Sequence, residues 1–292
     1  NTRGPRVVDT RISGRACRER LTSTGTSPGR TSAMEASRAT LLLAATLLLG
    51  YISHANAARC SMHGFCDTKK KLPCIYNSVP KPVTDQSARA IMKETCGDYF
   101  QIHGDSLCCD AAQIKQLANQ VKALENLGLR RCEACYANFQ KLLCNMACSP
   151  HQGDFLQVVH YDEGPHEVAE IANFYVDYAT MRDLYVSCIN PRRFVRFAPL
   201  SFTICGEDYL NCTMKLWYGA LGKRRVGLTS VDVTYEPVTN EAVFIGLREY
   251  RPFKDSMYGC NETVSGKTCV CEDCEAVCEN TDDAMKPVPL ST

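Results

Sequence analysis

Eighteen cysteines between Cys60 and Cys278 constrain the fold of this chain more than any other feature. They follow a short apolar segment that ends in Ala55-Asn56-Ala57, a run of small residues typical of a signal-peptide cleavage site. A secretory signal followed by an even number of closely spaced cysteines predicts oxidative folding, about nine disulfides, and a luminal or extracellular location. The eighteen are Cys60, Cys66, Cys74, Cys96, Cys108, Cys109, Cys132, Cys135, Cys144, Cys148, Cys188, Cys205, Cys212, Cys260, Cys269, Cys271, Cys274 and Cys278.

The chain divides into four segments. Residues 1–33 are rich in Arg, Gly, Ser and Thr and are expected to be a translated leader or a gene-model artefact without a fold. Residues 34–57 form the expected signal peptide, whose apolar core is shorter than the ~20 residues that a bilayer requires. Residues 58–279 are expected to form one domain, and residues 280–292 a Pro-containing linker or tail.

Charge excludes some partners. The chain has 33 Lys and Arg and 32 Asp and Glu, and because eight of the former and three of the latter precede Ala58, the remainder has a net charge of −4. No basic stripe remains to hold nucleic acid or an anionic membrane surface, so we expect no nucleic-acid partner.

Apolar periodicity predicts three helices. Asp110, with Gln113 three residues later, is a candidate capping box for a helix that ends at Gly128. Further helices are expected at about 131–147 and 167–187, each with one apolar face. The region before Asp110 is expected to be rich in loops, because glycines, prolines and a lysine run interrupt it.

The pattern changes period after Cys205. Apolar residues alternate at 231–235 and 243–247 around a turn, which predicts two antiparallel strands. Helices followed by strands indicate an α+β fold, here a disulfide-rich single domain in which helices pack with a small, mainly antiparallel sheet.

Two Cys-x-x-Cys pairs, Cys132 with Cys135 and Cys271 with Cys274, have the spacing of redox or zinc sites. In an exported chain with an even number of cysteines, each sulfur is expected to bond instead to a distant structural partner. We therefore expect no metal and no cofactor.

An enzymatic function finds no support. The Cys108-Cys109-Asp110 sequence is similar to the catalytic helix of secreted phospholipase A2, but no histidine follows it and no glycine-rich calcium loop precedes it. None of the histidines after residue 57 lies in a serine or cysteine nucleophile motif. We expect a protein that is not an enzyme.

Asn211 and Asn261 begin glycosylation sequons. Given the signal peptide, both are expected to carry a glycan.

The cysteine spacing as a whole resembles the luminal N-terminal domain of the Niemann-Pick C1 family. The resemblance rests on Cys60-x5-Cys66-x7-Cys74, Leu107-Cys108-Cys109-Asp110, Cys132-x2-Cys135-x8-Cys144-x3-Cys148-Ser149-Pro150 and Cys269-x-Cys271-x2-Cys274-x3-Cys278. It covers about Cys60 to Cys278, so all eighteen cysteines have a place in it. It implies the pairings Cys60–Cys108, Cys109–Cys148 and Cys205–Cys212.

The resemblance implies that the ligand is cholesterol or a related sterol, bound in an enclosed apolar pocket. It further implies a role in late endosomal or lysosomal sterol transport, with a small soluble luminal carrier as partner. Membrane contact is expected only through a transmembrane portion that this chain lacks. If the protein acts alone, the expected location is extracellular.

By the same resemblance, Gln113 corresponds to the glutamine that binds the sterol hydroxyl. The alternative for Gln113 is a capping box without ligand contact. For the pocket walls the alternative is ordinary core packing. The positions that correspond to walls are Met62, Leu117, Tyr136, Leu143 and, more loosely, Leu228. Ile204, Gly206 and Asp208 correspond to the surface that faces the carrier.

Two departures from the family pattern lie near the expected hydroxyl site. Pro73 stands where an asparagine often shares the sterol hydroxyl, and Phe65 replaces an acidic residue. Since proline has no side-chain hydrogen-bonding group and no N–H, the polar end of the pocket is expected to be barer than in relatives.

Two other kinds of ectodomain remain as alternatives. Folate- or riboflavin-receptor-like proteins stack planar rings between several tryptophans, whereas this chain has only Trp217. An adhesive ectodomain without a ligand is the other, because disulfides indicate the compartment and not the ligand.

Overall fold

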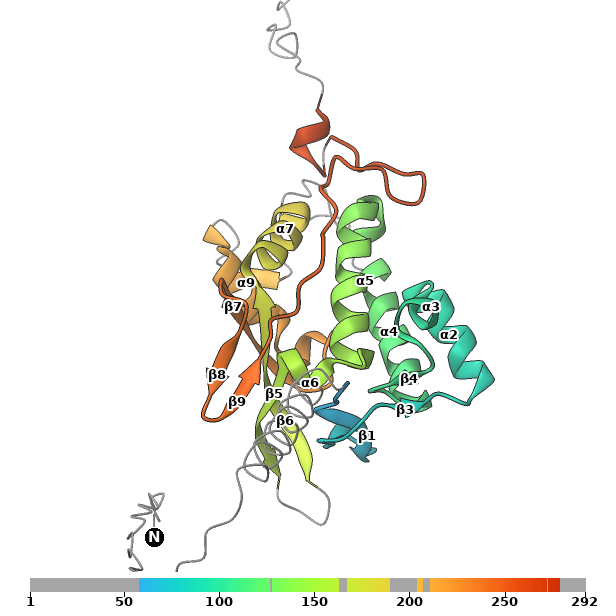
Figure 1. The fold of residues 1–292 in the computed structure, drawn as a ribbon. Helices are drawn as coiled ribbons and strands as arrows, with labels where there is room; N and C mark the ends of the chain where they lie inside the picture. Colours follow the sequence, from blue (N-terminus) through green and yellow to red (C-terminus); the bar gives the residue numbers. More distant parts are fainter. Residues whose placement is uncertain are drawn as a thin grey trace, which may run out of the picture. The chain divides into compact units, whose positions relative to one another are not determined.

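We describe the chain from a computed structural model (Figure 1). The described residues are 58–278 apart from 127, 163–166, 190–203, 207–210 and 272. All of them belong to the second of the two compact units of the chain, Ala57–Thr292. The expected leader, signal peptide and tail, together with Asp208, lie outside the described residues.

The N-terminal third contains more regular structure than its loop-rich sequence indicates. Strands β1 (Met62–Asp67) and β2 (Leu72–Ile75) form an antiparallel hairpin, and helix α2 (Gln86–Cys96) follows. Helix α2 begins where the side chain of Asp85 accepts a hydrogen bond from the N–H of Ala88, at 3.0 Å. Three short elements complete this part: β3 (Lys81–Pro82), α3 (Tyr99–His103) and β4 (Ser106–Leu107).

The first two predicted helices are confirmed. Helix α4 (Ala111–Asn126) buries its apolar face and ends before Gly128, which has a left-handed φ of 81°. A 3-10 turn, Leu129–Arg131, leads into helix α5 (Glu133–Cys148). The two helices pack against each other and present one face of each to the interior (Figure 1).

The third predicted helix is wrong over its first half. Residues Val168–Asp177 form strand β6, and helix α7 (Tyr178–Ile189) begins only afterwards. Strand β6 is apolar on both faces, because Phe174 packs in the main core whereas Tyr175 packs in a second cluster with Val238 and Tyr250. A strand buried on both faces loses the alternation that distinguishes it from a helix.

The strand pairing also differs from the expectation. Strand β7 (Asp232–Val238) pairs in parallel with β6, not with the following strand, and β8 (Val243–Ile245) pairs with β9 (Arg248–Tyr250). Strand β5 (Leu156–Asp162) pairs with β6 in antiparallel orientation. The remaining elements are α6 (Gln152–Phe155), α9 (Met214–Leu221) and the 3-10 turns Arg224–Val226 and Glu275–Val277.

The fold class is confirmed: helices pack with small, mainly antiparallel sheets, and nine disulfides join the elements. One core unites the two halves. Phe139 of α5 contacts Trp217 of α9 with ring centroids 5.4 Å apart, and both rings are fully buried. The connection between β6 and β7, which contains α7 and α9, is therefore part of the same core as α4 and α5.

Candidate ligand site

Gln113 lies in a reciprocal capping box at the start of α4. The side chain of Asp110 accepts a hydrogen bond from the N–H of Gln113 at 2.8 Å, and Gln113 Oε1 accepts one from the N–H of Asp110 at 3.1 Å. The same Oε1 accepts a second bond, at 2.6 Å, from the N–H of Gly64 in β1. Gly64 has a left-handed φ of 72°, and a Cβ there would lie 3.3 Å from Asp110 Oδ2, so this close approach favours glycine.

These bonds fix the orientation of the Gln113 amide. Both partners of Oε1 are N–H donors, and a flipped amide would place its own NH₂ group against them. Nε2 is therefore the group left free, and among the described residues it has no protein acceptor. A ligand at this position meets a hydrogen-bond donor.

Gln113 lines a small cavity of about 50 Å³. Apolar side chains of Met62, Leu156 and Val231 line it together with Pro73, so the position that departs from the family pattern lies at this cavity. Among the other polar groups there, Gln152 is already saturated: its Oε1 accepts from the N–H groups of Ser61 and Met62, and its Nε2 donates to the carbonyls of Met146 and Ala147.

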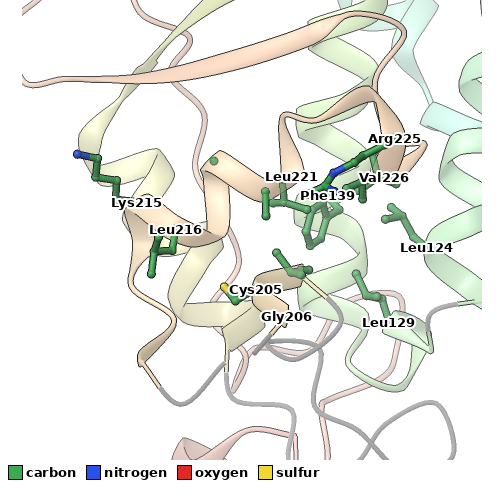
Figure 2. A pocket seen from close by; sticks show the side chains of 14 residues that line it. Leu124, Leu129, Phe139, Cys205, Gly206, Lys215, Leu216, Leu221, Arg225 and Val226 are labelled. Atoms are coloured by element: carbon green, nitrogen blue, oxygen red, sulfur yellow. The ribbon is translucent and has the colours of Figure 1, made fainter. Parts of the chain in front are cut away.

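A groove of about 840 Å³ lies toward the other end of α4 (Figure 2). Leu124 of α4, Phe139 of α5 and Leu221 of α9 contribute apolar side chains to it, whereas Lys215 points away (Figure 2). Three of the residues singled out in the sequence line this groove: Leu228, Ile204 and Gly206.

The other expected wall residues lie in different surroundings. Leu117 and Leu143 are each 1% exposed and pack in the core. Tyr136 lines a separate groove, where its hydroxyl lies 3.1 Å from Glu125 Oε1 and the Arg130 guanidinium lies 4.6 Å from its ring. Met62 and Gln113 thus share one cavity, Leu228 lies at the groove, and Tyr136 lies at neither.

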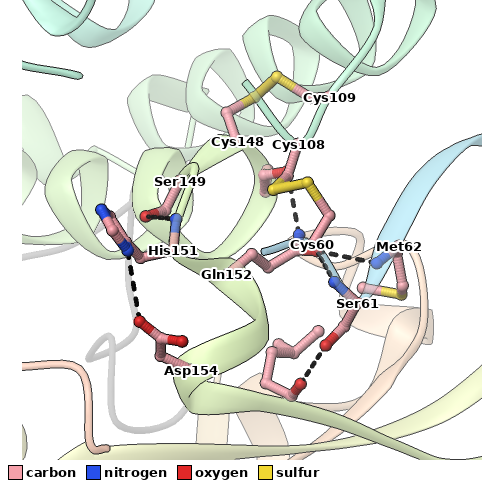
Figure 3. The surroundings of a disulfide bond; sticks show 12 residues. Cys60, Ser61, Met62, Cys108, Cys109, Cys148, Ser149, His151, Gln152 and Asp154 are labelled. Carbon is pink, nitrogen blue, oxygen red and sulfur yellow. Dashed lines mark hydrogen bonds and ion pairs between the residues drawn. A yellow bond between two sulfur atoms is a disulfide. The ribbon is translucent and has the colours of Figure 1, made fainter. Parts of the chain in front are cut away.

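Disulfides hold β1 against the helices next to Gln113. The adjacent pairs Cys60–Cys108 and Cys109–Cys148 connect the start of β1 to the segment before α4 and that segment to the end of α5 (Figure 3). Figure 3 also shows Gln152 beside the Ser61–Met62 segment, whose two N–H groups donate to Gln152 Oε1. The three pairings implied by the cysteine spacing are present, because Cys205 bonds to Cys212.

Neither Cys-x-x-Cys pair closes on itself. Cys132 bonds to Cys269 and Cys135 to Cys188, while Cys271 bonds to Cys278 and Cys274 to Cys260. All four sulfurs therefore serve as structural bridges, as expected. Within the described part of the chain, no group of three or more His, Cys, Asp or Glu side chains is arranged to hold a metal ion.

His63 lies beside the capping box on β1. Its ring is 5.1 Å from that of Tyr76 and half-buried. Burial lowers the pKa of His63 below its usual value, the charge of Lys81 lowers it further, and Asp110 opposes both effects. The His63 imidazole therefore favours its neutral form.

Residues 57–291 match the family model described as the Niemann-Pick C1 N terminus. The chain belongs to this family. The Niemann-Pick C1 match covers the whole disulfide-bonded domain, including both cavities and the capping box.

Three relatives carry the name NPC intracellular cholesterol transporter 1 or a homolog of it. "NPC intracellular cholesterol transporter 1" of Sus scrofa is 26% identical over 224 residues, which cover 74% of this chain and 17% of that protein. The homolog 1 of Caenorhabditis elegans is 32% identical over 211 residues, covering 70% of this chain and 14% of that protein, and homolog 1b of Drosophila melanogaster is 26% identical over 229 residues, covering 72% and 17%. The chain thus spans about a sixth of the length of these relatives. None of the helices in the described ranges is long and apolar enough to cross a membrane.

Sequence reasoning missed two polar residues of this Niemann-Pick C1 domain. Gln120 and Thr229 line the same cavity as Gln113 and are 6% and 4% exposed. A signal for Gln120 was available, because it interrupts the apolar face of α4 two turns after Gln113. Thr229 gives no comparable signal, since a threonine before a strand is ordinary.

Proposed function

We propose that this domain binds cholesterol or a related sterol between α4, α5 and the segment that precedes β7, and that it performs no chemistry on its ligand. One observation carries the proposal: helix α4 places Gln113 at a small cavity, where its amide N–H has no acceptor among the described residues, and Leu124 at an apolar groove. Eleven residues of helix separate the two positions, roughly 16 Å at 1.5 Å per residue. An elongated, rigid molecule with one polar end matches this arrangement.

The energetics assign different roles to the two ends. Burying roughly 500 Å² of sterol surface contributes on the order of 12 kcal/mol before the costs of association. A hydroxyl hydrogen bond to Gln113 Nε2 contributes only about 0.5–1.5 kcal/mol. Apolar side chains such as Leu124 and Phe139 therefore set the affinity, and the amide sets the orientation and rejects sterol esters.

The family and the disulfides support the biological setting that we propose. The relatives are named cholesterol transporters, and nine disulfides are typical of the secretory pathway. We place the domain in the late endosomal or lysosomal lumen as part of a sterol transporter, with a small soluble carrier delivering the sterol to the groove lined by Ile204 and Gly206. Asn211 and Asn261 are both exposed and accessible to glycosylation.

The decisive experiment is binding of radiolabelled cholesterol to the oxidised, glycosylated domain. Saturable binding that unlabelled sterol competes and folate does not would support the proposal. Competition by folate or riboflavin would indicate a vitamin receptor instead. Absence of saturable sterol binding by protein with all nine bridges formed would refute the proposal and favour an adhesive role.

A further inference from the structure

Two buried polar atoms at the cavity of Gln113 have no hydrogen-bond partner among the described residues. They are Gln120 Nε2 and Thr229 Oγ1. Both side chains line the cavity and are more than nine-tenths buried. Buried polar groups in folded proteins are nearly always paired, so two unpaired atoms that line one cavity indicate an occupant that pairs with them.

The residues around these two atoms indicate which kind of molecule would bind there. Gln113 and Gln120 lie two turns apart on the same face of α4, and each offers an amide N–H group. Thr229 offers a hydroxyl, which can accept as well as donate. The remaining lining includes Met62, Leu156 and Val233, which are apolar. The occupant therefore has a hydroxyl group attached to an apolar body.

We infer that Gln120 and Thr229, together with Gln113, hold the sterol hydroxyl, and that they select a free 3β-alcohol over the corresponding 3-ketone. This inference rests on the proposed sterol-binding function. The hydroxyl oxygen accepts from the amide groups of Gln113 and Gln120, and its proton is donated to Thr229 Oγ1. A ketone can accept from the amides but has no proton to donate, so it leaves the acceptor capacity of Thr229 unused.

This assignment also accounts for Pro73. Pro73 lines the cavity but supplies neither a donor nor a side-chain acceptor. Thr229 approaches the same cavity from the segment before β7 and supplies a hydroxyl there. The polar end of the site is therefore not bare, and its second partner comes from a different part of the chain.

Thr229→Val tests the inference, with Thr180→Val as the matched control. Thr180 is as deeply buried as Thr229, but its hydroxyl donates to the carbonyl of Asp255 at 2.9 Å. Thermal unfolding of the ligand-free, oxidised protein should show that Thr229→Val is at least as stable as the parent, whereas Thr180→Val is less stable. If Thr229→Val is destabilised as much as the control, its hydroxyl already has a partner and the inference is overturned.

Binding supplies the second readout. Thr229→Val should weaken saturable binding of radiolabelled cholesterol by about three- to tenfold, and competition should show a smaller preference for cholesterol over cholest-4-en-3-one. Gln120→Met should act in the same direction, whereas Gln152→Met, which breaks a saturated amide, should lower stability instead. Parental cholesterol and ketone binding by Thr229→Val would overturn the inference and leave the sterol function intact. Failure of the parent protein to bind any sterol would overturn both.

Discussion

Replacement of Gln113 by alanine should reduce both stability and sterol binding, for separable reasons. The variant removes Oε1, which accepts from the N–H groups of Asp110 and Gly64. Two backbone donors lose their acceptor, at about 1 kcal/mol each, so the free energy of unfolding should fall by about 2 kcal/mol. For a domain of this size that corresponds to a melting temperature about 4–8 °C lower. Loss of Nε2 should weaken cholesterol binding by about two- to tenfold.

Asp110→Ala provides the control. It removes the acceptor of the Gln113 N–H bond and so breaks the capping box, but it leaves Gln113 Nε2 in place. We expect a loss of about 1 kcal/mol in stability and parental sterol affinity per folded molecule. Thermal unfolding and binding of radiolabelled cholesterol, normalised to folded protein, measure the two effects. If both variants bind cholesterol as the parent does, Gln113 is a capping residue only and the assigned hydroxyl contact is wrong.

Three further variants test the same region and its covalent frame. Gly64→Ala, at a left-handed φ and close to Asp110 Oδ2, should lower the free energy of unfolding by about 1–2 kcal/mol in urea titrations, and an unchanged midpoint would contradict the strain. Because the pKa of His63 is lowered in the folded protein, the unfolded chain binds this proton more readily, and stability should fall as pH drops below about 6.5. The His63→Gln variant should lose less stability than the parent between pH 7 and pH 5, and an equal loss would refute this role. Replacing Cys132 and Cys269 by serine opens a bridge that spans 137 residues and should cost about 2–5 kcal/mol, seen as a lower melting temperature and poorer secretion; parental values for both would show that the bridge is dispensable.

The sequence predicted those elements whose start and end depend on residues close together in the chain. Asp110 and Gln113 satisfy each other's backbone within four residues, so α4 could be predicted with its start and its end at Gly128. Strand β6 could not be predicted in the same way, because its burial on both faces depends on β7 and the β8–β9 hairpin, which are distant in sequence. Its parallel pairing with β7 across 54 residues, from Asp177 to Asp232, left no local pattern either.

The residues of the candidate site also differ in how far the sequence predicts them. The resemblance of the cysteine framework to a family predicted Gln113 and Met62 as ligand contacts, and the two residues line one cavity. Gln120 and Thr229 stand out only because each is buried and has an atom without a partner among the described residues. Burial of this kind depends on several segments at once, so no single stretch of sequence predicts it. Tyr136 was predicted as a wall from its position relative to the cysteines, and its hydroxyl lies near Glu125 and Arg130 at a separate groove.

The distribution of bridges gives the two ends of the site unequal freedom. At the amide end, Cys60–Cys108 and Cys109–Cys148 join three separate elements. Between Cys188 and Cys260, by contrast, the sequence holds only Cys205 and Cys212, which form a ring of their own. Two bridges thus tie the elements around Gln113 to one another, whereas the bridge nearest the groove closes only a short loop and leaves α9 without a covalent link to α4 or α5.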